Sequence, residues 1–294
     1  MTFRNQLVNG DCVEEMRRLP PQSVNLCIID PPYFKVKGHY WDNQWNTADN
    51  FLSWMDIVLD EVNRVLKPSG SLYLFCYPRM AFEVEAVVRK HFTVLNHLVW
   101  EKYNDKGFDG WKQKTRISSL RGFYPNSERI IFAEKGGLGE FLKSRRKAKS
   151  LSTIKLAEIA GAHGKVNHGG AVSNWEKGLN TPTEEQYEKI KNILELPERG
   201  DLIRTFTLNR DNQYTDVLRF KTVKPYKGKH PTEKPLNLIS HLVETSSSKG
   251  DLIMDCFAGS GVLATACMQL ERDYLLIEKD KDYFDKIHER LCGE

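Results

Sequence analysis

The sequence predicts an α/β protein: a doubly wound, mostly parallel sheet with a helical insert. Short runs of β-branched and aliphatic residues recur along the chain, with helical stretches between them. Such alternation is typical of a parallel sheet covered by helices. The rhythm breaks over residues 136–215, where no convincing core strand occurs. A chain of 294 residues is long enough for one large domain with a smaller insert.

The individual elements follow from local composition. Seven segments are expected to be strands: 6–9, 24–29, 71–76, 94–101, 129–134, 252–256 and 274–278. Apolar residues at helical spacing predict helices over 51–66, 79–91, 236–246 and 262–270. The segment Lys67-Pro68-Ser69-Gly70 is expected to end the first of these helices.

The insert is expected to be helical over 153–160, 169–177 and 182–194. For the last helix we expect Thr181 as the N-cap, Pro182 at the first position and Glu184 closing a capping box. We therefore expect two domains. Residues 1–135 and 216–294 would form the catalytic domain, and residues 136–215 would form the insert.

The net charge is only +4, but the positive charge is concentrated. Residues 102–121 carry a net +4, and residues 143–149 and 219–229 each carry +5. Solvated loops would explain any one of these runs. Three of them together favour a surface that faces a polyanion such as nucleic acid.

The composition excludes several classes of protein. No apolar run approaches the roughly 18 residues that a membrane-spanning helix needs, and the first residues lack the apolar segment of a secretory signal. The six cysteines include no close pair, which is typical of reduced thiols and not of a disulfide framework or a zinc site. We expect a cytoplasmic protein that does not associate with membranes.

The sharpest motif is Asp30-Pro31-Pro32-Tyr33, directly after the predicted strand 24–29. Ligands of open α/β sheets bind beyond the carboxyl ends of the strands. The prolines cannot donate hydrogen bonds, so the segment offers a carboxylate, rigid carbonyl oxygens and an aromatic face. That set suits an amino group on a flat ring. The alternative is an ordinary turn at the end of a strand.

A glycine loop, Asp255 to Gly261, lies between a predicted strand and a helix. Glycines allow tight turning and close approach to a ligand, and Glu278 ends the following strand, where an acid can bind ribose hydroxyls. A nicotinamide-dependent oxidoreductase is one alternative. Only one further strand follows this loop, however, and Asp30-Pro31-Pro32-Tyr33 would have no role in that enzyme.

The segment from His230 to Pro235 precedes the predicted helix 236–246. Lys234 beside a helix N-terminus could bind a carboxylate. A helix start capped by proline, with a solvated lysine, is the simpler interpretation of this segment alone.

Taken in order, these motifs resemble those of the permuted (beta-group) DNA amino-methyltransferases that use S-adenosylmethionine. The resemblance rests on Asn9-Gly10-Asp11-Cys12, Asp30-Pro31-Pro32-Tyr33, Trp100-Glu101-Lys102, Ser127-Glu128-Arg129-Ile130, Thr215-Asp216-Val217, His230 to Pro235 and Asp255 to Gly261. It implies a Rossmann-like class I methyltransferase fold with a seven-stranded sheet whose last hairpin is antiparallel. Residues 252–256 and 274–278 would be its nominal first two strands.

The resemblance also implies roles for individual residues. Asp30, Pro31, Pro32 and Tyr33 would be catalytic, holding a flipped-out base. S-adenosylmethionine would be bound by Asp11, Cys12, Asp30, Lys234, Asp255, Phe257, Ala258, Gly259, Ser260, Gly261, Glu278 and Lys279. Among these, Lys234 would meet the cofactor carboxylate and Glu278 the ribose. Trp100 is a candidate second wall for the base; a core tryptophan is the alternative.

Residues 152–196 resemble a helix-turn-helix, with 169–177 as the recognition helix. Candidate DNA contacts are Lys143, Arg145, Arg146, Lys147, Ser173, Asn174 and Lys177. A helical cap with Trp175 in its core is the alternative. His163 and His168 lack further clustered ligands, so no metal site is expected.

The resulting prediction is a site-specific methyltransferase acting on N6 of adenine in double-stranded DNA. Relatives with Asp at the position of Asp30 mostly modify adenine, whereas those with Ser mostly modify cytosine. N4-cytosine methylation is the first alternative, and a helix-turn-helix regulator with a degenerate enzyme core is the second. The resemblance leaves a homodimer and a partner restriction endonuclease open.

Overall fold

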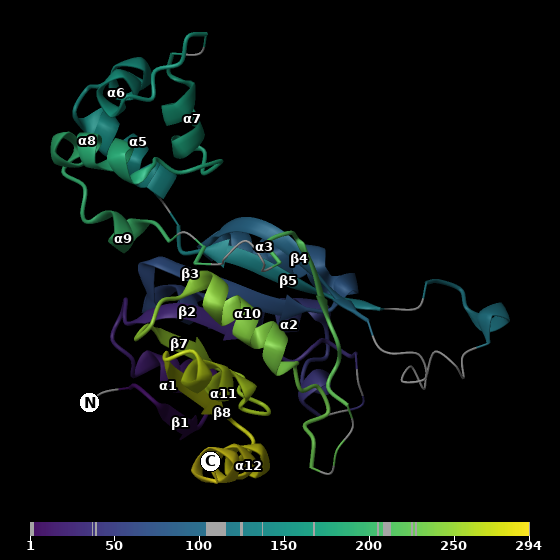
Figure 1. Ribbon diagram of the computed structural model, residues 1–294. Coiled ribbons are helices and arrows are strands. Elements are labelled where there is room, and N and C mark those ends of the chain that lie inside the picture. Colours follow the sequence, from purple (N-terminus) through teal and green to yellow (C-terminus); the bar gives the residue numbers. More distant parts are fainter. Residues whose placement is uncertain are drawn as a thin grey trace. The chain divides into compact units, whose positions relative to one another are not determined.

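A computed structural model describes residues 3–36, 38, 40–103, 116–123, 126–136, 138–166, 168–204, 206–207, 213–224, 226 and 228–293. The chain divides into two compact units (Figure 1). The sheet unit comprises Met1–Leu66, Ser71–Glu134 and Phe206–Glu294, and the helical unit comprises Lys67–Gly70 and Lys135–Thr205. The division thus falls at Thr205, before the expected boundary at residue 215. Residues 104–115 of the first basic stretch and Lys227 of the third lie outside the described residues.

Among the described residues, the sheet has eight strands in the order β1-β8-β7-β2-β3-β5-β4-β6. In chain order they are β1 (Gln6–Asn9), β2 (Val24–Ile29), β3 (Leu66–Cys76), β4 (Thr93–Lys102), β5 (Ser127–Glu134), β6 (Val217–Phe220), β7 (Leu252–Asp255) and β8 (Asp273–Glu278). Neighbouring strands are parallel, except that β5 is antiparallel to both β3 and β4. The described sheet therefore has one strand more than the expected seven, because the short strand β6 was not predicted. Its four residues carry too little apolar pattern to stand out in the sequence.

Helices cover both faces of the sheet, which confirms the doubly wound α/β class. One face packs against α1 (Cys12–Arg17), α2 (Ala48–Val65) and α3 (Ala81–His91). The other packs against α10 (Leu236–Ser246), α11 (Val262–Gln269) and α12 (Lys281–Cys292). The first core lies between the sheet and α1–α3, and the second lies between the sheet and α10–α12. In β2, Cys27 and Ile29 belong to the first core, whereas Leu26 and Ile28 belong to the second. A strand that is buried on both faces explains the continuous apolar run in the sequence.

The expected elements differ from the structure in several places. The segment expected to end a helix, 67–70, lies inside β3, and α2 already ends at Val65. Short or strongly charged helices were not predicted; they include α1, α12 and, in the helical unit, α5 (Leu138–Ala148) and α9 (Arg199–Leu202). No described helix combines the length and apolar character needed to cross a membrane.

In the helical unit, α6 (Thr153–Ala160), α7 (Gly170–Glu176) and α8 (Glu184–Leu194) correspond to the three expected helices. The N-cap of α8 is Thr183, not Thr181, and its capping box closes with Gln186, not Glu184. Pro182 therefore precedes the helix. The sequence offers two threonines two residues apart, each followed three residues later by a side chain that can close a capping box, and the structure uses Thr183.

A separate apolar core holds the helical unit together, with Trp175 and Tyr187 among its buried residues. The Arg146 side chain is only 12% exposed. Its Nη2 donates to Glu176 Oε2 at 3.0 Å, and its Nη1 donates to the Leu151 carbonyl at 2.7 Å. Arg146 therefore joins α5 to α7, and Glu176 compensates its charge; its contact with DNA stays a prediction.

We predict that Arg146→Ala destabilises the helical unit by about 3 kcal/mol, because it leaves the Glu176 carboxylate buried without its partner. Lys147→Ala is the matched control: Lys147 is the next residue and is exposed. Thermal and denaturant unfolding of the two variants measure the difference. Equal stabilities would show that the Arg146–Glu176 pair does not stabilise the unit.

Candidate active site

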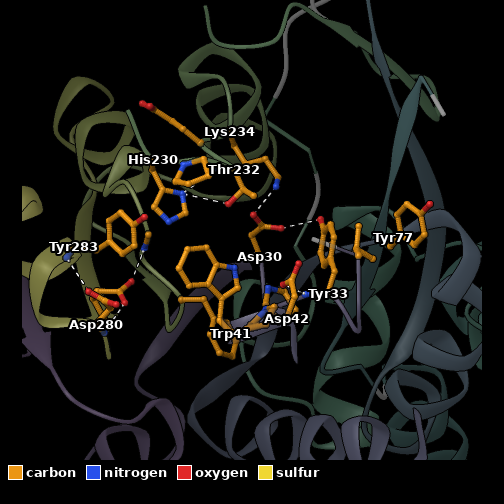
Figure 2. A pocket seen from close by; sticks show the side chains of 18 of the residues that line it. Asp30, Tyr33, Trp41, Asp42, Tyr77, His230, Thr232, Lys234, Asp280 and Tyr283 are labelled. Carbon is orange, nitrogen blue, oxygen red and sulfur yellow. Dashed lines mark hydrogen bonds and ion pairs between the residues drawn. The ribbon is translucent and has the colours of Figure 1, made fainter. Parts of the chain in front are cut away.

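A cavity of about 430 Å³ opens at the carboxyl ends of the parallel strands in the sheet unit. It is lined by residues that follow β1, β2, β3, β7 and β8 in the chain. The start of β5 reaches the same edge, because β5 runs in the opposite direction. Figure 2 shows Asp30, Tyr33 and Lys234 on one side of the cavity and Trp41, His230 and Tyr283 on the other.

Asp30 and Tyr33 are joined directly. The Tyr33 hydroxyl donates to Asp30 Oδ1 at 2.8 Å, and the Tyr33 backbone N–H donates to Asp42 Oδ1 at 2.9 Å. Pro31 and Pro32 also line the cavity. The motif is therefore a fixed loop with its carboxylate and ring facing a cavity, and not merely a turn at the end of a strand.

Lys234 lies between two carboxylates. Its ammonium binds Asp30 Oδ2 and lies 3.3 Å from Glu128 Oε2, and the Lys234 side chain is only 6% exposed. Lys102 pairs with the other oxygen of Glu128, Oε1. The described ion pairs of Lys234 are thus with protein acids. Its implied contact with a cofactor carboxylate stays a prediction.

These charges shift one another's protonation. Burial raises the pKa of Asp30; the Glu128 charge acts in the same direction and Lys234 acts against it. Burial also acts to raise the pKa of Glu128, but Lys234 and Lys102 outweigh it and lower the value to about 2. Burial opposes the charge on Lys234, yet its two carboxylate partners raise its pKa. Glu128 and Lys234 are therefore charged at neutral pH.

The glycine loop is held by two carboxylates. Asp255 Oδ1 accepts the Phe257 N–H at 2.9 Å. Glu278 accepts the N–H of Gly259 at 2.7 Å through Oε2 and that of Asp280 at 2.8 Å through Oε1. Each Glu278 oxygen keeps a second lone pair for a hydroxyl group of a ligand.

The loop requires glycine at two positions. Gly259 and Gly261 have φ angles of +54° and +72°, a region that disfavours other residues. A Cβ on Gly261 would also lie 2.7 Å from Ile287 Cγ2 on α12. Gly261 therefore allows close packing of α12, whereas Gly259 lines the cavity itself.

Asp11 and Cys12 lie at the start of α1 on the same cavity. Asp11 is the N-cap of α1: its Oδ1 accepts the Val13 N–H at 3.0 Å. Its other oxygen, Oδ2, lies 3.2 Å from Lys279 Nζ. Asp11 and Lys279 thus form an ion pair in the lining of the cavity.

An aromatic wall, Trp41, His230 and Tyr283, was not predicted from the sequence. The rings of Trp41 and His230 lie nearly parallel with centroids 6.0 Å apart, and Tyr283 contacts both edge-on (Figure 2). Tyr40, beside Trp41, donates to Asp280 Oδ2 at 2.7 Å. The wall joins segments far apart in the chain, so no local pattern indicates it.

The cavity thus contains most of the predicted site residues. Those that line it are Asp11, Cys12, Asp30, Pro31, Pro32, Tyr33, Trp100, Lys234, Phe257, Gly259, Glu278 and Lys279. Asp255, Ala258 and Ser260 line a small adjoining cavity of about 50 Å³. Gly261 lines neither of the two.

Trp100 is mainly a core residue. It is 2% exposed, packs in the second core, and its indole N–H donates to the Phe220 carbonyl at 2.9 Å. Its role as a wall for a base stays a prediction. Glu128, by contrast, was not among the predicted site residues, although it lies in one of the segments that carry the family resemblance. Within the described part of the chain, no three His, Cys, Asp or Glu side chains are placed to hold a metal ion.

A family model described as "DNA methylase" (N6/N4) matches residues 24–289. The chain belongs to the DNA methylase family. This match spans the strand before Asp30, the cavity residues that follow it and the glycine loop.

Individual relatives of this DNA methylase are distant. It is 26% identical to "Type II methyltransferase M1.MboII" of Moraxella bovis, with 96% of this chain and 94% of the relative covered. It is 23% identical to "DNA adenine methyltransferase YhdJ" of Escherichia coli (strain K12), with 94% and 79% covered.

Two solved structures share the fold. One is an M1.HpyAVI–SAM complex, with a TM-score of 0.55, 20% identity and coverage of 97% and 98%. The other is the cytosine-N4-specific PvuII DNA methyltransferase, with a TM-score of 0.59, 14% identity and coverage of 98% and 86%. At these identities the likeness supports the class I methyltransferase fold of this chain.

We predict that Asp255→Asn removes a pH-dependent loss of stability. Burial raises the pKa of Asp255 to about 8, whereas in the unfolded chain this carboxyl ionises near its ordinary value of about 3.9. Between these values the folded state binds more protons, so the free energy of unfolding falls as pH rises, by up to about 1.4 kcal/mol per pH unit.

Denaturant unfolding between about pH 5 and pH 8 measures this effect. The Asp255→Asn variant should show the smaller fall in stability. Asp49→Asn, which removes an exposed acid from α2, serves as the control for the change in net charge. If wild type and Asp255→Asn lose stability equally, Asp255 does not carry its proton in the folded protein.

Proposed function

We propose that this DNA methylase transfers a methyl group from S-adenosylmethionine to the exocyclic N6 of a flipped-out adenine in double-stranded DNA. The observation that carries the proposal is the Asp30-Pro31-Pro32-Tyr33 loop. Its carboxylate and ring face a cavity that the glycine loop also lines. A target nitrogen and a methyl donor can therefore be held in one cavity.

The residues of the loop act on the amine. The lone pair of an exocyclic amine is delocalised into its ring, which makes the nitrogen a poor nucleophile. Hydrogen bonds from its two N–H groups to Asp30 and to the Pro31 carbonyl would favour a tetrahedral nitrogen and direct its lone pair outwards. Catalysis then comes from positioning and from a fixed electrostatic field. Asp30, or water, accepts the proton that the methylated amine releases.

The cavity residues fit the proposed cofactor. Glu278 keeps free lone pairs for ribose hydroxyls. Gly259, whose φ of +54° disfavours other residues, brings the backbone of the loop to the cavity. S-adenosylmethionine supplies a methyl group on a sulfonium, and its sulfur keeps the electron pair of the broken C–S bond. Asp11 and Lys279 border the end of the cavity proposed for the adenine of the cofactor.

The target base must leave the DNA stack to reach Asp30. Tyr33 is placed to stack on it, and stacking of this kind contributes roughly 1–3 kcal/mol in single-strand binders. The hydroxyl of Tyr33 is already held by Asp30, so its ring is presented in a fixed orientation.

The helical unit is proposed to recognise DNA. Lys147 and Lys177 are exposed and are the strongest candidates for phosphate contacts. Lys143 pairs with Glu140 and Arg145 lies 3.6 Å from Glu195, so their charges are partly compensated. Ser173 and Asn174 on α7 are half-buried and stay candidates for base contacts.

Adenine is proposed over cytosine because Asp30 holds the first position of the motif. The relative YhdJ is named a DNA adenine methyltransferase, whereas the PvuII enzyme, which shares the fold, is cytosine-N4-specific. N4-cytosine therefore stays the alternative product. A homodimer and a partner restriction endonuclease are proposed only by family analogy.

We predict that Asp30→Ala and Asp30→Asn each lower methyl transfer more than tenfold, a loss of at least about 1.4 kcal/mol of barrier reduction. Both variants lose the carboxylate that accepts the amine N–H, and Asn keeps the side-chain shape. Cofactor binding, measured by calorimetry, should change much less than turnover.

Turnover above a tenth of the wild-type value in either variant would remove Asp30 from the reaction. A wild-type protein that binds DNA and transfers no methyl group would instead favour the regulator with a degenerate enzyme core. Transfer of tritiated methyl groups to DNA distinguishes these outcomes.

We predict that the modified nucleoside is N6-methyladenine. DNA from a host that expresses the protein is digested to nucleosides and analysed by mass spectrometry, and DNA from a host that expresses Asp30→Ala is the control. N4-methylcytosine without N6-methyladenine would overturn the choice of base and leave the proposed mechanism intact.

A further inference from the structure

A second carboxylate lies beside Asp30, and the proposed chemistry gives it no task. Glu128 Oε2 is 3.2 Å from the Tyr33 hydroxyl and 3.3 Å from the Lys234 ammonium. Both of these groups also bind Asp30. Asp30 and Glu128 therefore share the same two hydrogen-bond donors.

This sharing matters because the Tyr33 hydroxyl has only one proton to donate. It donates to Asp30 Oδ1 at 2.8 Å, the shorter of its two contacts. An amine that approaches Asp30 meets two oxygens that each already accept a hydrogen bond, Oδ1 from Tyr33 and Oδ2 from Lys234, and must share one of them. Glu128 Oε2 lies close enough to receive the Tyr33 proton when the amine takes its place, so the hydroxyl need not lose its hydrogen bond.

Lys102 keeps Glu128 available for this exchange. It binds Glu128 Oε1 and leaves Oε2 to face Tyr33 and Lys234. Glu128 is the second residue of β5 and lies directly opposite Trp100 of β4, and Lys102 ends β4. Two adjacent antiparallel strands thus fix the acid and its counter-ion.

We propose that Glu128 is a positioning residue for methyl transfer: it accepts the Tyr33 hydroxyl and shares the Lys234 charge, and so leaves Asp30 free to accept the target amine. This inference rests on the proposed function. It assigns to Glu128 an effect on Asp30 and no contact with substrate.

The charges around Asp30 determine the sign of the test. The titratable or charged groups that face it are Tyr33, Cys76, Glu128, Lys234 and Asp255, and Lys102 acts on it through Glu128. The negative charge of Glu128 raises the pKa of Asp30, and Lys234 lowers it. Without Glu128, Lys234 pairs with Asp30 alone, so the pKa of Asp30 falls. Without Lys102, the negative charge of Glu128 is less compensated, and since Lys234 still holds Glu128 ionised, the pKa of Asp30 rises.

The experiment compares Glu128→Gln with Lys102→Gln. Because an ionised Asp30 is needed to accept the amine, activity is lost as pH falls through the pKa of Asp30. We expect the acid limb of the kcat/KM profile to move to lower pH in Glu128→Gln and to higher pH in Lys102→Gln, each by about half a pH unit or more. A merely structural role would not produce opposite shifts.

Glu134→Gln is the matched control, since Glu134 lies at the other end of β5, and its acid limb should stay at the wild-type pH. A double-mutant cycle with Tyr33→Phe tests the exchange of the hydroxyl proton. Glu128→Ala, which removes the acceptor together with the charge, should cost less turnover in the Tyr33→Phe background, where no hydroxyl competes for Asp30. Additive losses, an unmoved acid limb or shifts of the same sign would each overturn the proposal.

Direct titration of the Asp30 carboxyl by ¹³C NMR, assigned with Asp30→Asn, gives a readout that needs no activity. The pKa of Asp30 is again expected to fall in Glu128→Gln and to rise in Lys102→Gln. Unshifted titration would refute the role of Glu128 even in a protein with full activity. An inactive wild-type protein that shows the expected shifts would count against the proposed function alone. If Glu128→Gln does not fold, the Lys102→Gln titration decides the matter.

Discussion

The site depends on one buried cation, Lys234. An ammonium with a 6% exposed side chain is stable only if carboxylates replace the water it has lost. Asp30 and Glu128 supply them, and they come from the loop after β2 and from the start of β5. This single requirement brings together three chain segments that are far apart in the sequence. It also holds Asp30 in a fixed place at the cavity.

The direction of β5 makes this arrangement possible. The carboxyl ends of the parallel strands meet at one edge of the sheet, where loops carry the ligand-binding groups. Because β5 is antiparallel to β3 and β4, its first residues lie at that edge. Glu128 therefore reaches the cavity from the beginning of a strand, whereas Asp30 and Glu278 reach it from strand ends. The reversed strand adds a charge that a wholly parallel sheet would not place there.

The sequence predicts much of this fold, because strands and glycine loops leave local patterns. β1 and β2 have the expected bounds, and Asp30 and Gly259 lie at the same cavity as their motifs indicate. Contacts between distant segments leave no such pattern. The Trp41–His230 wall depends on such contacts, as does the burial of Arg146 against Glu176. A basic run shows only that charges are close in the chain and not which of them face solvent. Thr181 and Thr183 show the same limit for helix caps. Both fit the local pattern of an N-cap, and only the position of the first helical turn decides which of them is used.

The neutral balance of the site has a chemical consequence. Asp30 and Glu128 are matched by Lys234 and Lys102, so the side of the cavity proposed to hold the target amine carries two negative and two positive charges. A neutral amine can enter such a site without meeting an uncompensated charge. Proton loss after methylation then requires a local acceptor. The burial of Asp30 and its proximity to Glu128, which raise the pKa of Asp30, make this carboxylate a better base than a solvated aspartate. The same contacts that fix Asp30 in place thus prepare it to accept a proton.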